Sequence, residues 1–102
     1  MQHITNASIQ LIPIGLDRHP YAWVDEAIEV IEQSGLSYTV GPFGTVVEGS
    51  YQQVSGLIED INQYLFGKQC PEWVLQVQWH IRSGKDVTAE EKTKGRRSGN
   101  SK

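Results

Sequence analysis

Two stretches of the chain, far apart in the sequence, alternate apolar and polar residues. They span residues 4–12 and 73–82. Strict alternation places the apolar side chains on one face of a strand and the polar ones on the other. Pro13 and Gly15 are expected to end the first of these strands. The chain must therefore fold around a sheet that contains both stretches and buries one of its faces.

Two segments between these strands repeat apolar residues at helical spacing. The first begins at Pro20, which suits the first turn of a helix, and closes at Gly35. The second opens with Ser50 and, three residues later, Gln53, which together form a capping box. Its apolar periodicity continues to Gly67. Two amphipathic helices are therefore predicted.

Two short β-type runs, residues 36–40 and 45–49, lie between the helices and are joined by Gly-Pro-Phe-Gly, which predicts a hairpin. The element order predicts an α+β fold, the ferredoxin-like βαββαβ sandwich, with a four-stranded antiparallel sheet and two helices on one face. After Arg82 the apolar periodicity stops. We predict a single ferredoxin-like domain at residues 1–84 and a polar, mobile C-terminal tail at residues 85–102.

The strand pattern divides the predicted sheet into an apolar and a polar face. The side facing the helices receives Ala7, Ile9, Leu11, Leu75, Val77 and Trp79. The open side receives Asn6, Ser8, Gln10, Gln76, Gln78 and His80. Glu48 should join the open side, because an unpaired carboxylate among the helices would cost several kcal/mol, while Thr45 and Val47 face the helices. Such a polar face suits plain solvent exposure, a hydrogen-bonding ligand or a subunit contact.

Charge is unevenly distributed along the chain. Residues 1–82 carry three basic and nine acidic side chains, a net charge of −6, whereas residues 83–102 carry six basic and three acidic ones, a net charge of +3. An acidic body argues against nucleic acid as a partner and favours a cationic or neutral small ligand. No apolar run approaches the roughly 20 residues of a membrane span, and no signal peptide pattern is present, so we expect a cytoplasmic protein without a membrane partner.

Few residues of the chain suit catalysis or metal binding. Cys70 is the single cysteine, which excludes an internal disulfide and favours a small, semi-buried residue over a catalytic thiol. The histidines His3, His19 and His80 lack metal-ligand spacing. Hydrolysis of the acylphosphatase type would need a phosphate-binding arginine, and Arg18 is the only obvious one in the predicted loop before the first helix. We therefore expect a protein that is not an enzyme and needs no metal or cofactor.

The predicted hairpin and its surroundings carry three short motifs. They are I-P-I-G at 12–15, S-G-L-S-Y at 34–38 and G-P-F-G-T-V-V-E-G at 41–49. Together they resemble the thiamine-binding family related to YkoF, and the similarity spans residues 4 to about 94. The resemblance implies a non-catalytic protein that self-associates into dimers or tetramers. It also implies binding of thiamine or its hydroxymethylpyrimidine part, in handling or transport of the vitamin.

Carried over residue by residue, the resemblance implicates Thr45 and Glu48, with Gly44 and Gly49 as backbone positions. Phe43 stands where many relatives have Met. Thiamine joins a cationic thiazolium to an aminopyrimidine, so a carboxylate, neutral amides and a stacking aromatic ring are suitable partners. The predicted ligand-binding residues are Asn6, Ser8, Gln10, Phe43, Gly44, Thr45, Glu48, Gln78 and His80.

An alternative remains open from the residues alone. The polar sheet face would then be a subunit interface of an oligomeric structural or interaction protein. Glu48 would pair with a donor across that interface, and no small molecule would be involved.

Overall fold

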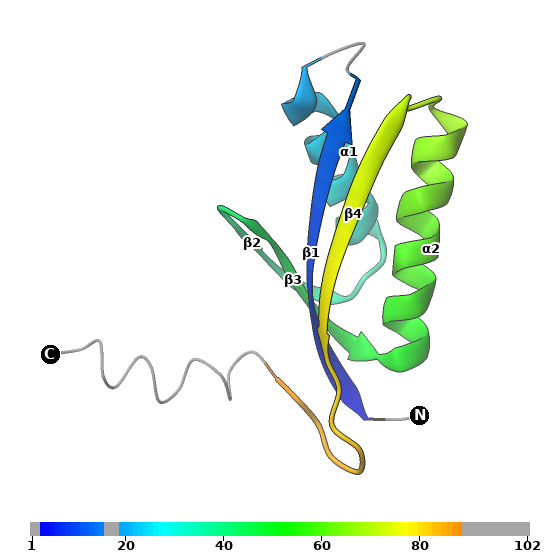
Figure 1. Ribbon diagram of the computed structural model, residues 1–102. Helices are drawn as coiled ribbons and strands as arrows, with labels where there is room; N and C mark the ends of the chain where they lie inside the picture. Colours follow the sequence, from blue (N-terminus) through cyan, green and yellow to red (C-terminus); the bar gives the residue numbers. More distant parts are fainter. Residues whose placement is uncertain (1–2, 16–18, 89–102) are drawn as a thin grey trace, which may run out of the picture.

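The computed structural model describes residues 3–15 and 19–88. Its elements follow in this order: β1 (Ile4–Ile14), α1 (Pro20–Gln33), β2 (Ser37–Gly41), β3 (Gly44–Ser50), α2 (Tyr51–Gly67) and β4 (Glu72–His80). The strands form one antiparallel sheet in the order β2-β3-β1-β4, and both helices lie on the same side of it (Figure 1). The predicted ferredoxin-like α+β sandwich is confirmed.

The first strand extends further than the sequence pattern predicted. Pro13 does not end β1, which continues to Ile14, and Pro13 pairs with Trp73 of β4. On its other side, β1 pairs with β3 only as far as Ile9 and Thr45. Beyond that pair one edge of β1 has no neighbouring strand, and a residue without an N–H is tolerated at such an edge. The expected end at Pro13 was wrong for this reason.

Local side-chain chemistry explains where the helices begin and end. Pro20 opens α1, and the side chain of His19 caps its first turn. Gly35, just after α1, has a φ of +81°, which glycine adopts without strain. At the start of α2, Ser50 Oγ accepts from the Gln53 N–H at 3.1 Å and Gln53 Oε1 accepts from the Ser50 N–H at 2.9 Å. The predicted capping box is confirmed.

The hydrophobic core lies between the helices and the sheet. The strand residues assigned to this side are either buried in it or pack against it: Ala7, Ile9, Leu11, Leu75, Val77 and Trp79. The helices supply apolar residues at helical spacing: Trp23, Ala27, Ile31, Val54, Leu57, Ile61 and Leu65. Cys70 is also buried in this core, as its expected structural role requires.

One buried threonine links three strands of the sheet through its side-chain hydroxyl. Thr5 Oγ1 donates to the carbonyl oxygen of Gly49 on β3 at 2.8 Å, and it accepts from Trp79 Nε1 on β4 at 2.9 Å. Thr5 is 1% exposed, so these bonds satisfy polar groups that water does not reach. Trp79 thus lies on the helix side of the sheet, as strand alternation predicted, and packs against the core.

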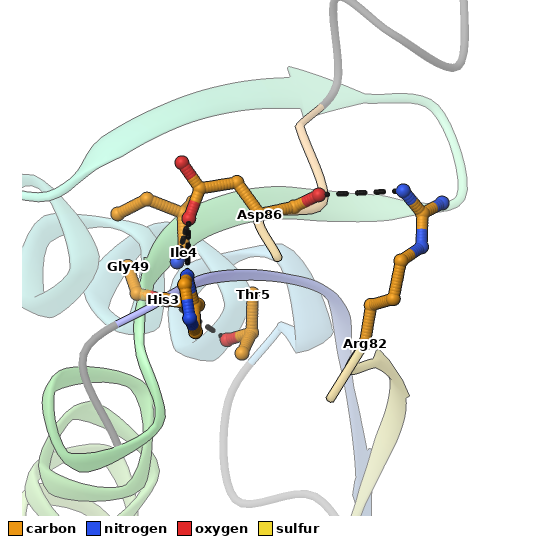
Figure 2. A network of polar contacts seen from close by, with 6 residues as sticks. All are labelled: His3, Ile4, Thr5, Gly49, Arg82 and Asp86. Atoms are coloured by element: carbon orange, nitrogen blue, oxygen red, sulfur yellow. Dashed lines mark hydrogen bonds and ion pairs between the residues drawn. The ribbon is translucent and has the colours of Figure 1, made fainter. Parts of the chain in front are cut away.

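The chain beyond β4 turns back to the start of β1 (Figure 2). β4 ends at His80, earlier than predicted. The Asp86 carboxylate accepts from the Ile4 N–H at 2.8 Å, and the Val87 N–H donates to the Ile4 carbonyl oxygen at 2.8 Å. Val87 is fully buried. The first residues of the predicted tail are thus bound to the sheet. Residues 89–102 of that tail lie outside the described residues. The division into domain and tail therefore stays a prediction.

Candidate functional site

One row of predicted site residues crosses the sheet face that carries no helix. Asn6 on β1 pairs with Glu48 on β3 and with His80 on β4. The structure thus places Glu48 on the face that strand alternation indicated, where it is half-buried. Asn6 is only 5% exposed although no helix covers this face. Its amide is therefore not presented to a ligand arriving from solvent, whereas His80 is exposed.

Further along β1 the same face forms a shallow polar hollow. Ser8 pairs with Gln78 and Gln10 with Gln76 on β4, and these side chains line the hollow. Phe43, at the tip of the β2–β3 hairpin, borders it and is 82% exposed. Hydroxyl and amide groups can each donate and accept hydrogen bonds. The hollow thus combines adaptable polar groups with an uncovered aromatic ring.

A second cavity lies on the helix side of the sheet and is mostly apolar. It has a volume of about 370 Å³ and lies between α1, the far end of β1 and the β2–β3 hairpin. Leu11, Val24 and Ile28 contribute to its walls, and Tyr21 and Phe43 also line it. This apolar pocket was not predicted, because the sequence pattern assigned this side to a filled core.

Thr45 and Glu48 lie on opposite faces of the sheet, although both belong to the hairpin motif. Thr45 pairs with Ile9, is 4% exposed and lines the apolar pocket. Glu48 lies three positions along β3, in the row with Asn6 on the open face. The structure therefore brings Ser8, Gln10, Gln78 and Phe43 together at the polar hollow. Thr45 lies apart from Ser8 and Gln78, but it shares the apolar pocket with Gln10 and Phe43. The sequence did contain a signal for the apolar pocket, namely a polar residue at a strand position that faces the helices.

Close packing accounts for the two motif glycines, Gly44 against β1 and Gly49 against the side chain of Leu36 before β2. A Cβ atom on Gly44 would lie 3.1 Å from the carbonyl oxygen of Ile9 and 3.3 Å from Ser8 Oγ. A Cβ atom on Gly49 would lie 3.2 Å from Leu36 Cδ2. All three distances are shorter than ordinary van der Waals contact. A larger residue at Gly44 would push β3 away from the β1 backbone, and one at Gly49 would displace the Leu36 side chain. Gly44 in particular holds the hairpin close to β1 beside the polar hollow.

Comparison with known proteins assigns the chain to a family. A family model described as thiamine-binding protein matches residues 7–97. This range includes most of β1 and the whole hairpin motif. The chain belongs to the thiamine-binding protein family. The resemblance carried by the three motifs is thereby confirmed.

Individual relatives of this family member support the same assignment. A UPF0045 protein from Clostridium perfringens is 29% identical over 87 residues, which cover 85% of this chain and 90% of that protein. A solved DUF77 domain of unknown function from Bacillus cereus has a TM-score of 0.82 and 29% identity, covering 90% of this chain and 88% of its own. A proposed thiamine biosynthesis/salvage protein from Thermotoga maritima has a TM-score of 0.82 and 30% identity, covering 91% and 98%. The family description and the Thermotoga protein both connect this fold with thiamine.

Two structural features bear on other classes of function. Within residues 3–15 and 19–88, no three side chains of His, Cys, Asp or Glu are grouped as metal ligands would be. Of the helices in the described part of the chain, none combines the length and the apolar character that crossing a membrane requires.

Proposed function

We propose that this protein binds thiamine or its hydroxymethylpyrimidine part without chemical change, in handling or transport of the vitamin in the cytoplasm. The observation that carries the proposal is the polar hollow beside Phe43. Ser8, Gln10 and Gln78 can match the donors and acceptors of a heteroaromatic ligand. The exposed ring of Phe43 can stack on a thiazolium cation. Membership of the thiamine-binding protein family supports the choice of ligand.

Charge on the body of the protein supports a cationic ligand. Glu48 lies on the same face as the hollow, and residues 1–82 carry a net charge of −6. A negative body raises the local concentration of a cation and speeds its association. Neutral amides, by contrast, bind ligands but are not proton-transfer groups. This composition favours binding without turnover.

Calorimetric titration with thiamine and with hydroxymethylpyrimidine tests the proposal. We expect saturable binding to the wild type and weaker thiamine binding to Phe43→Ala, by about 0.5–2 kcal/mol for the lost cation–π contact. Phe66→Ala is a matched control, because Phe66 is also an exposed aromatic residue but lies on α2. No heat at millimolar ligand with folded wild-type protein would show the proposal to be wrong.

Exposed apolar residues on the same face support a second candidate, self-association without a small ligand. Ile12 and Val74 pair across β1 and β4 and are 36% and 43% exposed, next to the polar hollow. A dimer or tetramer formed through this face would cover them, and Glu48 would meet a donor on the neighbouring subunit. Light scattering on the wild type and on Glu48→Ala separates the candidates. Loss of assembly in the variant, together with no binding of either ligand by the wild type, would favour the interface.

A further inference from the structure

We propose that residues 82–88 form a strap that opens on its own while the rest of the domain stays folded, and that the closed strap withholds Asn6 from the open face of the sheet. The second part rests on the proposed function, because it concerns access to the face that carries the polar hollow. The first part does not depend on a ligand. Three features of the strap support the proposal: how it is held, what it covers, and how few contacts keep it closed.

The strap takes the place of β4 as the neighbour of β1 at Ile4. β4 ends at His80, which lies opposite Asn6, so it does not reach Ile4. There the Ile4 N–H donates to Asp86 Oδ1 at 2.8 Å (Figure 2). The Ile4 carbonyl oxygen accepts from the Val87 N–H, also at 2.8 Å. Both backbone groups of Ile4 are therefore bonded to the strap.

Short-range contacts shape the strap into a closed turn. Gly84 has a φ of +88°, which glycine adopts without strain. Arg82 Nη1 donates to the carbonyl oxygen of Asp86 at 3.4 Å, across the base of the turn (Figure 2). His3 Nδ1 lies 3.4 Å from Asp86 Oδ1. Contacts from both ends of the described chain thus converge on Asp86, which makes it the anchoring residue of the strap.

The strap covers part of the open face beside Asn6. Val87 is fully buried, yet it does not belong to the hydrophobic core between the helices and the sheet. Its backbone is fixed at Ile4, whose side chain shares a face of β1 with Asn6 because the two residues are two positions apart. Asn6 is 5% exposed, although its neighbours Glu48 and His80 are half-buried and exposed and no helix covers this face. The strap is the described segment that is placed to cover Asn6.

Few contacts keep the strap closed. Val87 is its only buried residue, and residues 83–86 are exposed. Ordering a segment costs conformational entropy for every residue, and buried contacts and hydrogen bonds must offset that cost. Segments that bury little apolar surface open locally at a lower free energy than the core. The strap is therefore expected to open more easily than the sheet to which it is bound.

Opening of the strap extends the accessible polar face by one row. The row of Asn6, Glu48 and His80 lies directly beside the pair of Ser8 and Gln78, which lines the polar hollow. Uncovering Asn6 adds an amide that can donate and accept hydrogen bonds. A ligand that binds the open form more tightly shifts the population toward that form. The strap thus controls how much of the open face a heteroaromatic ligand can use.

Amide hydrogen exchange of the full chain, measured by nitrogen-15 NMR, tests whether the strap opens on its own. We expect the protection of the Ile4 and Val87 amides to be lower by about tenfold or more than that of Val47, which pairs with Ala7 inside the sheet. Exchange at Ile4 and Val87 should also be nearly independent of low urea concentrations, because the opening exposes little surface. Equal protection and equal urea dependence at all three amides would overturn the proposal. So would a Val87 amide without protection, because the strap would then not be closed in solution.

Replacing Asp86 tests the anchoring residue. Asp86→Ala should lower the protection of the Val87 amide about tenfold or more, although the hydrogen bond of that amide is not itself changed, because the strap loses a charged acceptor. Asp25→Ala removes an exposed carboxylate from α1 and is the matched control, with an effect of less than about twofold. Unchanged protection of Val87 in folded Asp86→Ala would contradict the anchoring role of Asp86.

A strap that is held open tests the effect on ligand binding. Val87→Asn replaces the buried side chain by a polar one of equal charge, so the strap should open while the sheet stays folded. We expect thiamine to bind this variant about tenfold more tightly than the wild type in calorimetric titration, the effect of one added hydrogen bond. Val30→Asn makes the same change at a half-buried position of α1 and should stay within about twofold of the wild type. Adding Asn6→Ala to Val87→Asn should remove the gain.

The outcomes separate the strap from the proposed function. Protein that binds neither thiamine nor hydroxymethylpyrimidine, with the strap closed or open, would contradict the proposed function and the second part of the proposal. The exchange measurements would still decide whether the strap opens on its own. Thiamine affinity in Val87→Asn that is no higher than in the wild type, with circular dichroism showing a folded variant, would overturn control of the open face by the strap. The proposed function would then stand without it.

Discussion

Replacing Val87 by alanine should destabilise the protein by about 2 kcal/mol, although the residue lies in a polar stretch of the sequence. Val87 is fully buried, and its N–H donates to the Ile4 carbonyl oxygen at 2.8 Å. The change removes two buried methyl groups. Burial of each contributes about 0.8 kcal/mol to the free energy of unfolding, and the small cavity left behind adds to the loss. The backbone hydrogen bond remains, so it does not enter the sum.

Urea denaturation followed by circular dichroism measures this free energy of unfolding. Val40→Ala is the matched control, because Val40 is 51% exposed on β2 and its truncation should change stability by less than about 0.5 kcal/mol. An effect of Val87→Ala no larger than that of Val40→Ala would refute the reasoning. Such a result would mean that the chain after β4 contributes nothing to the folded domain in solution.

Other substitutions address the remaining contacts. Thr5→Val should cost about 1–3 kcal/mol in urea denaturation, because it leaves the Gly49 carbonyl and the Trp79 indole N–H without their partner; a neutral effect would contradict the role of that hydroxyl. Gly44→Ala should cost about 1–3 kcal/mol in thermal unfolding, because its Cβ would lie 3.1 Å from the β1 backbone; wild-type stability would show that the strands separate easily. Glu48→Gln should weaken thiamine binding by less than about 1 kcal/mol in calorimetry, because Glu48 lies on the same face as the polar hollow but does not line it; a loss of about 1–3 kcal/mol would instead indicate a direct hydrogen bond from the ligand to Glu48.

The fold was predictable because strand alternation leaves little freedom. Shifting a strand by one residue exchanges its two faces, so the pattern of residues 4–12 determined which side of β1 meets the helices. Capping residues likewise set the helix ends, as at Ser50. The error at Pro13 arose because the pattern of one strand does not tell where its neighbour ends. That information depends on the register between β1 and β3.

The candidate site was predictable only in part. Alternation correctly separated Glu48 from Thr45, but their closeness in the hairpin motif had grouped them as ligand residues. Motif spacing does not distinguish the two faces of a strand, whereas the strand period does. The apolar pocket was not predicted, because a wall residue and a core residue have the same pattern in a sequence. Its one signal, a threonine that faces the helices, also occurs at Thr5, which is hydrogen-bonded within the core. Val87 was missed because a single apolar residue in a polar stretch shows no period.

The hairpin motif serves both the fold and the proposed site. Gly44 lets β3 approach β1 closely, and this contact sets where Phe43 lies between the polar hollow and the apolar pocket. Part of the motif is thus explained by packing alone. Pro42, Phe43 and Thr45 of the motif line the apolar pocket, whereas Glu48 lies on the opposite face of the sheet.

A crystal structure of the full chain grown with millimolar thiamine tests the central claim most directly. We predict one thiamine per chain at the polar hollow, with its aminopyrimidine against Ser8, Gln10 and Gln78 and its thiazolium beside Phe43. Well-ordered crystals without thiamine at either the apolar pocket or the polar hollow would contradict the claim that this protein binds the vitamin.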